Sequence, residues 1–176
     1  MVYNKYMKKC YFAGGCFWCI SGPFYELDSV LKVESGFSGG KEENPTYKEV
    51  KEGKTHHRET ICITYDENKI SLDSLVDIYL MNVDPFDKDG QFIDRGHNYT
   101  LALFYLDEDE KNLYFKKIKE VEEKSNKKAY IDVIKYDKFY LAEDEHQDFA
   151  LRNRDKYLEE LVISGRIKKW NYLRDY

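Results

Sequence analysis

Residues 14–19 read Gly-Gly-Cys-Phe-Trp-Cys, and this stretch constrains the fold and the chemistry of the chain more than any other. An apolar run at residues 11–13 leads into the two glycines, and an amphipathic segment follows at residues 17–27. A strand, a glycine turn and a helix start would place Cys16 at or next to the first helical residue. Free backbone N–H groups and the positive end of the helix dipole meet there, so a thiol ionises more easily to the nucleophilic thiolate. We therefore predict a reactive cysteine, beside which Phe17 and Trp18 offer an apolar cradle for a substrate group.

A second cysteine, Cys19, follows three residues later. The Cys-x-x-Cys spacing puts both sulfur atoms on one face of a helix, as a redox dithiol requires. Two other interpretations stay open: Cys16 as a small buried residue in a turn, or a zinc site built from Cys10, Cys16, Cys19 and Cys62 with His56 and His57. Structural zinc sites usually show two spaced ligand pairs, whereas this chain has one pair and scattered single residues. The pattern favours the reactive dithiol.

Composition places the chain among ordinary globular proteins. It has 176 residues, 42% of them hydrophobic and 35% charged, with a net charge of −5 and basic residues spread along the chain. Nothing in this pattern indicates nucleic acid or a membrane surface as a partner. The first nine residues lack the apolar core of a signal peptide, and the cysteines do not form a disulfide framework. We expect a cytoplasmic protein with reduced thiols, and a monomer.

Hydrophobic periodicity predicts an alternation of strands and helices. After the strand that precedes Gly14, alternating apolar residues favour strands at residues 29–37 and 59–65. Residues 99–106, which include a short apolar run, and residues 129–134 are also predicted as strands. Helical spacing favours a short helix at residues 47–52, a helix that starts after Ser71 and a long helix capped by Asp107 and Glu110, whereas residues 83–98 read as a loop. The order β-α-β-β-α-β-α-β indicates an α/β (α+β) domain, with helices covering one face of a mixed, mostly antiparallel sheet. We find no repeat or linker, so residues 1–176 are expected to form a single domain.

One carboxylate stands out in this pattern. The alternation at residues 59–65 puts Glu59 in phase with Ile61 and Ile63, on the face expected to meet the core. A carboxylate seldom occupies such a position without a task, because burial disfavours its charged form. The ordinary alternative is a solvated glutamate at the end of a strand. The four histidines are interpreted as structural or surface residues.

Several further segments, taken in order, resemble the A-type peptide methionine sulfoxide reductases. They read Ser-Gly-Phe-Ser-Gly-Gly, Asn-Pro-Thr-Tyr-Lys-Glu-Val, His-Arg-Glu, Asp-Pro, Gly-Gln, Asp-x-Gly with a following Tyr, and Phe-Tyr-x-Ala-Glu-Asp-x-His-Gln. The resemblance covers about residues 9–150, which would form the core of the domain, and leaves residues 151–176 as a charged C-terminal extension. The chain departs from the pattern at His56, Val83, Phe149 and the Tyr79-Leu80 pair.

The resemblance implies a fold and an activity. The family has a ferredoxin-like two-layer sandwich and reduces methionine-S-sulfoxide, free or in proteins, as a repair of oxidative damage. On its pattern Cys16 attacks the sulfoxide sulfur and becomes a sulfenic acid, while Glu59 protonates the sulfoxide oxygen. Phe17 and Trp18 would hold the methionine methyl group. Glu59 can act as this acid only if an apolar setting raises its pKa.

The resemblance also implies supporting residues and a source of electrons. Tyr47 and Tyr99 would hydrogen-bond the sulfoxide oxygen, and Asp94 would organise the polar side of the site. No bound cofactor is required, because electrons arrive by thiol exchange from thioredoxin, glutaredoxin with glutathione, or dithiothreitol in vitro. No cysteine follows Cys62, so we choose Cys19 as the thiol that resolves the sulfenic acid. Cys10 and an external thiol remain alternatives.

Two other functional classes compete with this interpretation. A Cys-x-x-Cys at a helix start is also typical of thioredoxin-like dithiol oxidoreductases, although there the motif does not follow two glycines and a carboxylic acid has no role. A zinc-binding module without catalytic activity is the second. Reduction of a methionine sulfoxide by dithiothreitol separates the reductase from both.

Overall fold

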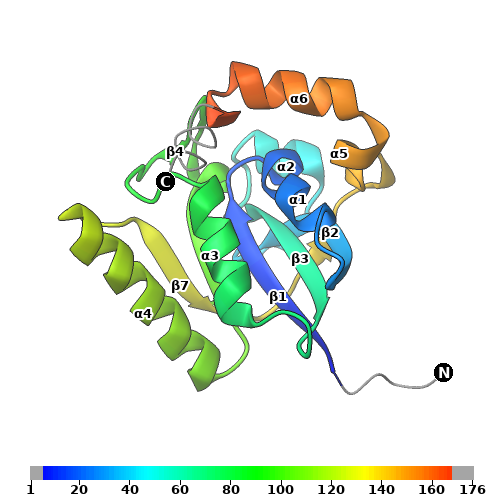
Figure 1. Ribbon diagram of the computed structural model, residues 1–176. Helices are drawn as coiled ribbons and strands as arrows, with labels where there is room; N and C mark the ends of the chain where they lie inside the picture. Colours follow the sequence, from blue (N-terminus) through cyan, green and yellow to red (C-terminus); the bar gives the residue numbers. More distant parts are fainter. Residues whose placement is uncertain (1–5, 168–176) are drawn as a thin grey trace.

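The computed structural model describes residues 6–167 and is built on a six-stranded sheet with the order β7-β6-β1-β3-β2-β8 (Figure 1). Its central unit runs β-α-β-β-α-β along the chain, through β1 (Met7–Gly14), α1 (Phe17–Tyr25), β2 (Val30–Ser38), β3 (Arg58–Asp66), α3 (Leu72–Asn82) and β6 (Leu101–Tyr105). The neighbouring strands of this unit, in the order β6-β1-β3-β2, are all antiparallel. This is the ferredoxin-like arrangement, so the predicted fold class is confirmed.

Two strands extend this unit at its edges. The long helix α4 (Glu108–Ser125) leads to β7 (Ile131–Lys135), which pairs with β6 in parallel. The short strand β8 (Tyr140–Leu141) pairs with β2 at the opposite edge. The Asp107 side chain accepts a hydrogen bond from the Glu110 N–H and caps α4, as the sequence predicts. Glu110 itself accepts from the Leu106 N–H, one residue before the position that a capping box requires.

Alternation along the strands divides the interior into two clusters. On the face covered by α1 and α3, Phe12 of β1 packs with Ile61 and Ile63 of β3 in the main core. On the other face, Tyr11 lies in a smaller cluster and stacks on Tyr136 with ring centroids 4.2 Å apart. The segment between β7 and β8 thus covers the face that the helices leave open.

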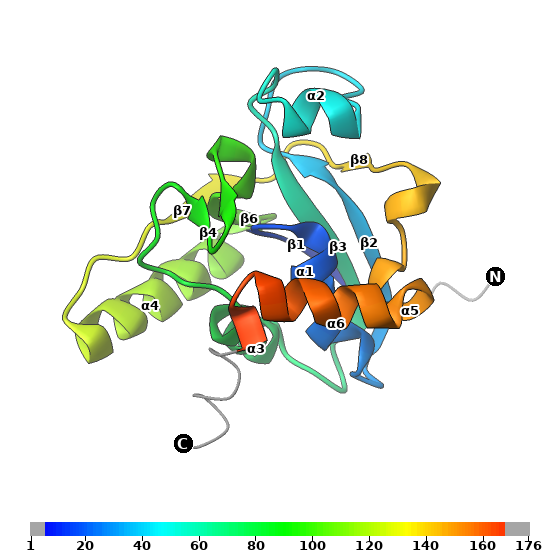
Figure 2. The same ribbon diagram turned by 90° about the horizontal axis from the view of Figure 1, so that it is seen from above.

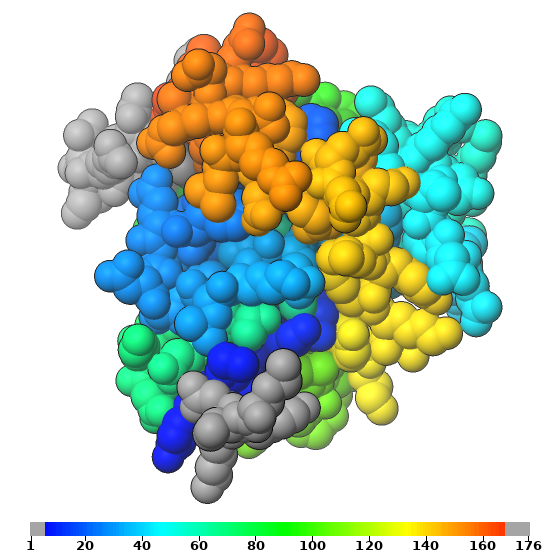
Figure 3. All heavy atoms as spheres, turned by 90° about the vertical axis from the view of Figure 1, so that its right-hand side faces the viewer, coloured from blue at the N-terminus to red at the C-terminus, as the bar shows by residue number. Residues whose placement is uncertain are grey.

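The C-terminal segment folds back over α1. Helices α5 (Phe149–Arg152) and α6 (Arg154–Ile163) lie across α1 in the view of Figure 2, and in Figure 3 their orange residues meet the yellow β7–β8 segment above β2. Phe149, Tyr157 and Leu161 form a third buried cluster with Cys19. Tyr157 can approach because α1 has glycine at position 22, where a Cβ atom would lie 1.9 Å from the Tyr157 hydroxyl. The last helix therefore contributes to the surroundings of the second cysteine.

Some boundaries differ from the sequence prediction. The segment predicted as a loop contains a small hairpin, β4 (Gly90–Gln91) and β5 (Asp94–Arg95), followed by the 3-10 helix η1 (His97–Tyr99). The strand predicted from residue 99 begins at Leu101, because Tyr99 still belongs to that 3-10 turn, in which its N–H donates to the Gly96 carbonyl. The end of the expected extension, residues 168–176, lies outside the described residues. Within residues 6–167, no helix is long and apolar enough to cross a membrane.

Candidate active site

Cys16 occupies the turn between β1 and α1. Gly15 has φ +83°, a left-handed conformation that favours glycine, and its Cβ position lies 2.5 Å from the Arg166 guanidinium. Cys16 is the N-cap residue of α1, and its carbonyl accepts the N–H groups of Cys19 and Ile20, each at 3.1 Å. Its side chain makes no capping hydrogen bond and is half-buried. The predicted position of Cys16 at the helix start is confirmed.

Glu59 lies next to this helix start. It is 1% exposed, on the face of β3 that meets the core, and its Oε2 accepts the Phe17 N–H at 3.0 Å. Burial raises the pKa of the Glu59 carboxyl well above its usual value, and the nearby Cys16 thiol adds to this rise. The hydrogen bond from Phe17 acts in the opposite direction but does not outweigh burial. The site thus contains a carboxylic acid that keeps its proton to higher pH than an ordinary glutamate.

Cys16 and Cys19 lie close enough for each thiol to influence the ionisation of the other. Cys19 and burial raise the pKa of the Cys16 thiol, whereas Cys16, aided by the Arg166 guanidinium, lowers the pKa of the Cys19 thiol. Burial and the neighbouring Cys19 thiol thus act against the easier ionisation of Cys16 that a helix start favours.

Two tyrosines and an aspartate approach the same place. Tyr47 is the first residue of α2 (Tyr47–Lys51), which is fixed by a capping box between Thr46 and Glu49. Burial raises the pKa of both Tyr47 and Tyr99, and the charges of Glu59 and Cys16 raise them further. Both phenols therefore stay protonated as hydrogen-bond donors. Asp94, on β5, is half-buried and has a raised pKa, also through burial.

Aromatic rings form the apolar side of the site. Phe17 is 1% exposed and belongs to the main core, so Trp18, which is half-buried, is the more accessible of the two predicted cradle residues. The Trp18 indole stacks on Phe149 with centroids 4.0 Å apart and an interplanar angle of 10°. His146 lies between Trp18 and Tyr47, with centroid distances of 5.6 and 4.1 Å. An apolar group of a substrate would meet this wall beside Cys16.

The remaining two cysteines lie elsewhere. Cys10 is fully buried in the main core, and Cys62 is buried in the cluster on the opposite face of the sheet. All four cysteines are free thiols. In the part of the chain that the structure describes, no group of three or more His, Cys, Asp or Glu residues is arranged to hold a metal ion.

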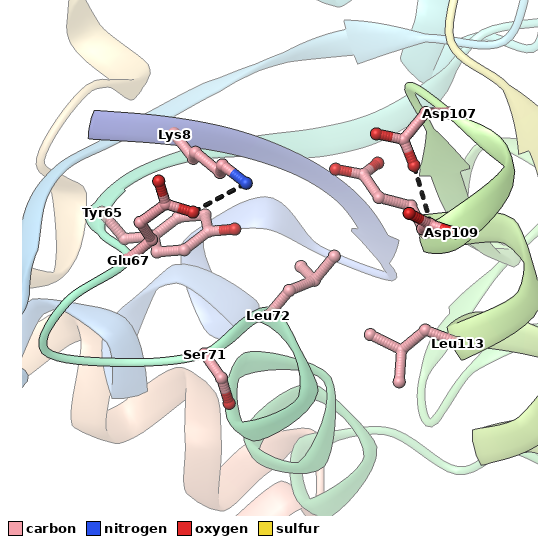
Figure 4. Close-up of a pocket in the computed structure, with 9 residues that line it drawn as sticks. Lys8, Tyr65, Glu67, Ser71, Leu72, Asp107, Asp109 and Leu113 are labelled. Atoms are coloured by element: carbon pink, nitrogen blue, oxygen red, sulfur yellow. Dashed lines mark hydrogen bonds and ion pairs between the residues drawn. The ribbon is translucent and has the colours of Figure 1, made fainter. Parts of the chain in front are cut away.

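Another pocket lies at the far end of β1 and is unrelated to Cys16. Figure 4 shows it between the start of β1 and the first turns of α3 and α4. Lys8 and Glu67 form an ion pair of 2.7 Å on one wall of it. The pocket carries acidic residues from α4 but no cysteine, so the thiol chemistry belongs to the opposite end of the strand.

The structure brings together every residue that the sequence analysis placed at the site, and it adds two. His146, interpreted above as structural or surface, is 4% exposed and lies in the aromatic wall. Arg166, which received no role, is 2% exposed and donates to the Gly14 carbonyl at 3.0 Å. The His-Gln pair at the end of the family-like segments was an available signal for His146. No local pattern marked Arg166, which lies 150 residues after Cys16 along the chain.

Comparison with known proteins agrees with this geometry. The family model described as peptide methionine sulfoxide reductase matches residues 8–173. The chain is 44% identical over 156 residues to peptide methionine sulfoxide reductase MsrA 2 of Staphylococcus aureus, covering 88% of each chain. It is 41% identical over 157 residues to peptide methionine sulfoxide reductase MsrA of Bacillus licheniformis, covering 88% of this chain and 87% of that protein.

Solved structures show the same relationship. The crystal structure of Mxr1 from Saccharomyces cerevisiae in reduced form superposes with a TM-score of 0.79 at 26% identity, covering 86% of this chain and 88% of that one. Methionine sulfoxide reductase A of Corynebacterium diphtheriae has the same fold, with a TM-score of 0.77 at 24% identity. This site has a half-buried cysteine at a helix start, a buried acid beside it and two protonated phenols. The chain that carries it belongs to the peptide methionine sulfoxide reductase family, as an A-type oxidoreductase that reduces methionine sulfoxide with electrons from thiols.

Proposed function

We propose that Cys16 and Glu59 carry out the reduction of methionine-S-sulfoxide, free or in oxidised proteins, as a repair reaction. The observation that carries this proposal is the buried Glu59 carboxyl beside Cys16, with its raised pKa. A sulfoxide oxygen leaves only after protonation, and a carboxylic acid that keeps its proton near neutral pH can supply it. The Tyr47 and Tyr99 hydroxyls hydrogen-bond this oxygen, and Asp94 orders the polar side.

The reaction is a two-electron transfer between sulfur atoms. The Cys16 thiolate attacks the sulfoxide sulfur while Glu59 protonates the oxygen. Transfer of the hydroxyl group to the Cys16 sulfur then releases methionine and leaves a sulfenic acid on Cys16. The substrate sulfur is reduced and the Cys16 sulfur is oxidised. Trp18, with Phe17 behind it, receives the methionine methyl group.

The stereochemistry of the substrate tests this arrangement. The phenols and Glu59 lie on the polar side of Cys16 and Trp18 lies on the apolar side, so only one sulfoxide epimer can direct its oxygen to the acid and its methyl group to the indole. We expect dithiothreitol-dependent reduction of the S epimer of a dabsylated methionine sulfoxide and none of the R epimer. The two pure epimers are assayed separately by chromatography. Equal rates for both epimers would contradict the assignment of the two sides.

Recycling is assigned to Cys19. Cys19 lies one helical turn from Cys16 and each thiol affects the ionisation of the other, so little movement is needed for the Cys19 sulfur to attack the sulfenic acid. Cys10 lies in the main core and Cys62 lies on the other face of the sheet. Neither position favours that cysteine as the resolving thiol. The resulting disulfide is reduced by an external thiol. A Saccharomyces cerevisiae homologue has been crystallised in complex with Trx2, and this supports a thioredoxin-like reductant here, with glutaredoxin and glutathione as alternatives.

We also propose a domain organisation, an oligomeric state and a location for the whole protein. We propose a single domain that includes the C-terminal extension, because α6 packs on α1 beside Cys19. A monomer in the cytoplasm fits a site formed from one chain and four free thiols. No bound cofactor enters the reaction, because each electron pair comes from a thiol.

A Cys16–Cys19 disulfide is the expected product of one turnover. Reduced protein treated with one equivalent of methionine-S-sulfoxide should lose two free thiols, and mass spectrometry of the digest should find these two cysteines joined. A disulfide requires a Cα separation within about 7 Å, which residues one helical turn apart meet, and properly directed Cβ atoms, which slight unwinding of the helix start would align.

Cys19→Ser is the matched variant for this experiment. It should still form one methionine per chain and then retain a sulfenic acid on Cys16, which dimedone traps. The Cys62→Ser variant, altered on the far face of the sheet, should form the disulfide as the unaltered protein does. If Cys16 stays a sulfenic acid in the unaltered protein while Cys19 remains free, recycling proceeds through an external thiol and the assignment of Cys19 is wrong.

A further inference from the structure

Arg166 connects the C-terminal segment to the cysteine turn. It follows α6 by three residues and is 2% exposed. One guanidinium nitrogen, Nη2, donates to the Gly14 carbonyl at 3.0 Å, and Nη1 donates to the Asn82 carbonyl at 2.9 Å. The guanidinium lies over the Phe92 ring, 4.7 Å from its centroid. A cation is thereby held directly behind the two glycines that precede Cys16.

Among the described residues, this cation forms no direct ion pair, although Asp94 lies near enough to interact with its charge. Among residues 6–167, no aspartate or glutamate forms an ion pair with Arg166, and its Nε has no hydrogen-bond acceptor. A buried guanidinium without a counter-ion is unfavourable, since it has lost its hydration and gains little in return from neutral carbonyls. The charge of Arg166 is therefore not engaged in a direct ion pair within residues 6–167 and is available to an anion that forms at the site during the reaction.

The thiol of Cys19 is the group that can supply this anion. Cys19 packs against Leu161, at the end of the helix that leads to Arg166, and Ile167 lies against the same cluster. The charged and titratable groups that face Cys19 are Cys16, Arg166, Asp94, Glu160 and Tyr157. Among these groups of the described residues, Arg166 carries the positive charge near Cys19, and it lowers the pKa of Cys19. The acidic neighbours, Asp94 and Glu160, act in the opposite direction.

We propose that Arg166 is the counter-ion of the Cys19 thiolate during recycling, and so a positioning residue for the closure of the Cys16–Cys19 disulfide. The proposal rests on the assignment of Cys19 as the resolving thiol. In this step the Cys19 thiolate attacks the Cys16 sulfur, an S–S bond forms and the S–O bond of the sulfenic acid breaks. The departing hydroxide takes up a proton and leaves as water. Cys19 is oxidised, the sulfenic sulfur is reduced, and no other reactant is needed.

The expected effect follows from thiol chemistry. Without the guanidinium, the fraction of Cys19 present as thiolate near neutral pH falls roughly tenfold for each unit by which its pKa rises. A thiolate of higher pKa is also more nucleophilic, which recovers part of the loss, so the net slowing is about 3–10-fold. The pH at which closure reaches its maximal rate should move upward.

Single-turnover kinetics with Arg166→Met test the proposal. Reduced protein is mixed with one equivalent of methionine-S-sulfoxide, and acid-quenched samples are analysed for methionine, for free thiols and for the mapped disulfide, from pH 6 to pH 10. Methionine reports the first step, and the disulfide reports closure. Arg166→Lys keeps the charge and should keep the pH profile close to that of the unaltered protein. Arg166→Gln provides a second neutral variant should the methionine variant fail to fold. Arg154→Met, an exposed arginine at the start of α6, is the control.

The outcomes are distinct. Slower closure with a pH profile moved upward in the neutral variants, and a profile restored by lysine, supports the proposal. Closure at the unaltered rate overturns it. Equal slowing of methionine formation and closure, with no shift in the pH profile, also overturns it, because a merely structural role for Arg166 would do the same. If the unaltered protein forms no Cys16–Cys19 disulfide, the failure lies with the assignment of Cys19 itself.

Discussion

The Cys16→Ser protein is expected to fold and to leave methionine sulfoxide unreduced. Serine keeps the size of the side chain at the N-cap of α1 and is itself a favoured N-cap residue, so the helix should form as before. A hydroxyl at this position does not ionise near neutral pH and cannot attack sulfur as a thiolate does. Removal of a covalent nucleophile lowers turnover by on the order of 10⁶-fold in well-studied enzymes, and a loss below detection is expected here.

This experiment separates chemistry from folding when stability is measured on the same samples. Thermal unfolding of Cys16→Ser should match that of the unaltered protein within a few degrees. Cys62→Ser is the control for a general effect of removing a thiol, because Cys62 lies in the cluster on the other face of the sheet. Substantial reduction of the sulfoxide by folded Cys16→Ser protein would show that another group attacks the substrate.

The parts of the site that the sequence predicts are those marked by short-range patterns. Cys16 follows two glycines, a pair that marks a tight turn. Glu59 belongs to a strand in which the alternation of apolar residues shows which side chains face the core. Both positions follow from local geometry, with contacts between them supplied by the antiparallel pairing of β1 with β3. Tyr47 and Tyr99 do not stand out among 16 tyrosines, and the family resemblance was needed to choose them.

The parts of the site that the sequence does not predict come from segments that lie far from Cys16 along the chain. Arg166 reaches the site because α5 and α6 fold back over α1, and packing at Gly22 and Tyr157 allows this. His146 reaches it from the segment that follows β8 at the edge of the sheet. No periodicity near residue 166 shows which neighbours a distant arginine will meet. The ionisation of Cys16 is not a local property either, since its pKa depends on burial and on Cys19 as well as on the helix start. Local patterns predict where a residue lies on its own element and do not predict its electrostatic surroundings.

Glu59→Gln is expected to slow reduction by ~10²–10⁴-fold, the usual contribution of a general acid. Glutamine keeps the shape of the side chain and can still accept the Phe17 N–H, but it cannot deliver a proton to the sulfoxide oxygen. Single-turnover formation of methionine is the measurement, because it excludes the recycling steps. Glu67→Gln, altered just beyond the other end of the same strand, should reduce the sulfoxide at the unaltered rate.

The raised pKa of Glu59 also predicts how the rate of the reduction step changes with pH. Because burial raises the pKa of Glu59, its protonated form persists above the pH at which an ordinary glutamate ionises, and the rate of the reduction step should fall as pH rises through that raised pKa. The free energy of unfolding depends on pH for the same reason. The buried, protonated Glu59 contributes fully below the pKa that Glu59 has in the unfolded chain, and this contribution is lost as pH rises through its higher pKa in the folded protein.

Glu59→Gln removes both effects together. The variant should therefore unfold at a higher temperature than the unaltered protein in alkaline buffer while reducing the sulfoxide far more slowly. An acid with a purely structural role would produce neither the slow reduction step nor the loss of its pH dependence. Near-normal methionine formation by Glu59→Gln would place the proton donor elsewhere, with the Tyr47 and Tyr99 hydroxyls as the next groups to replace, since both are kept protonated beside Cys16.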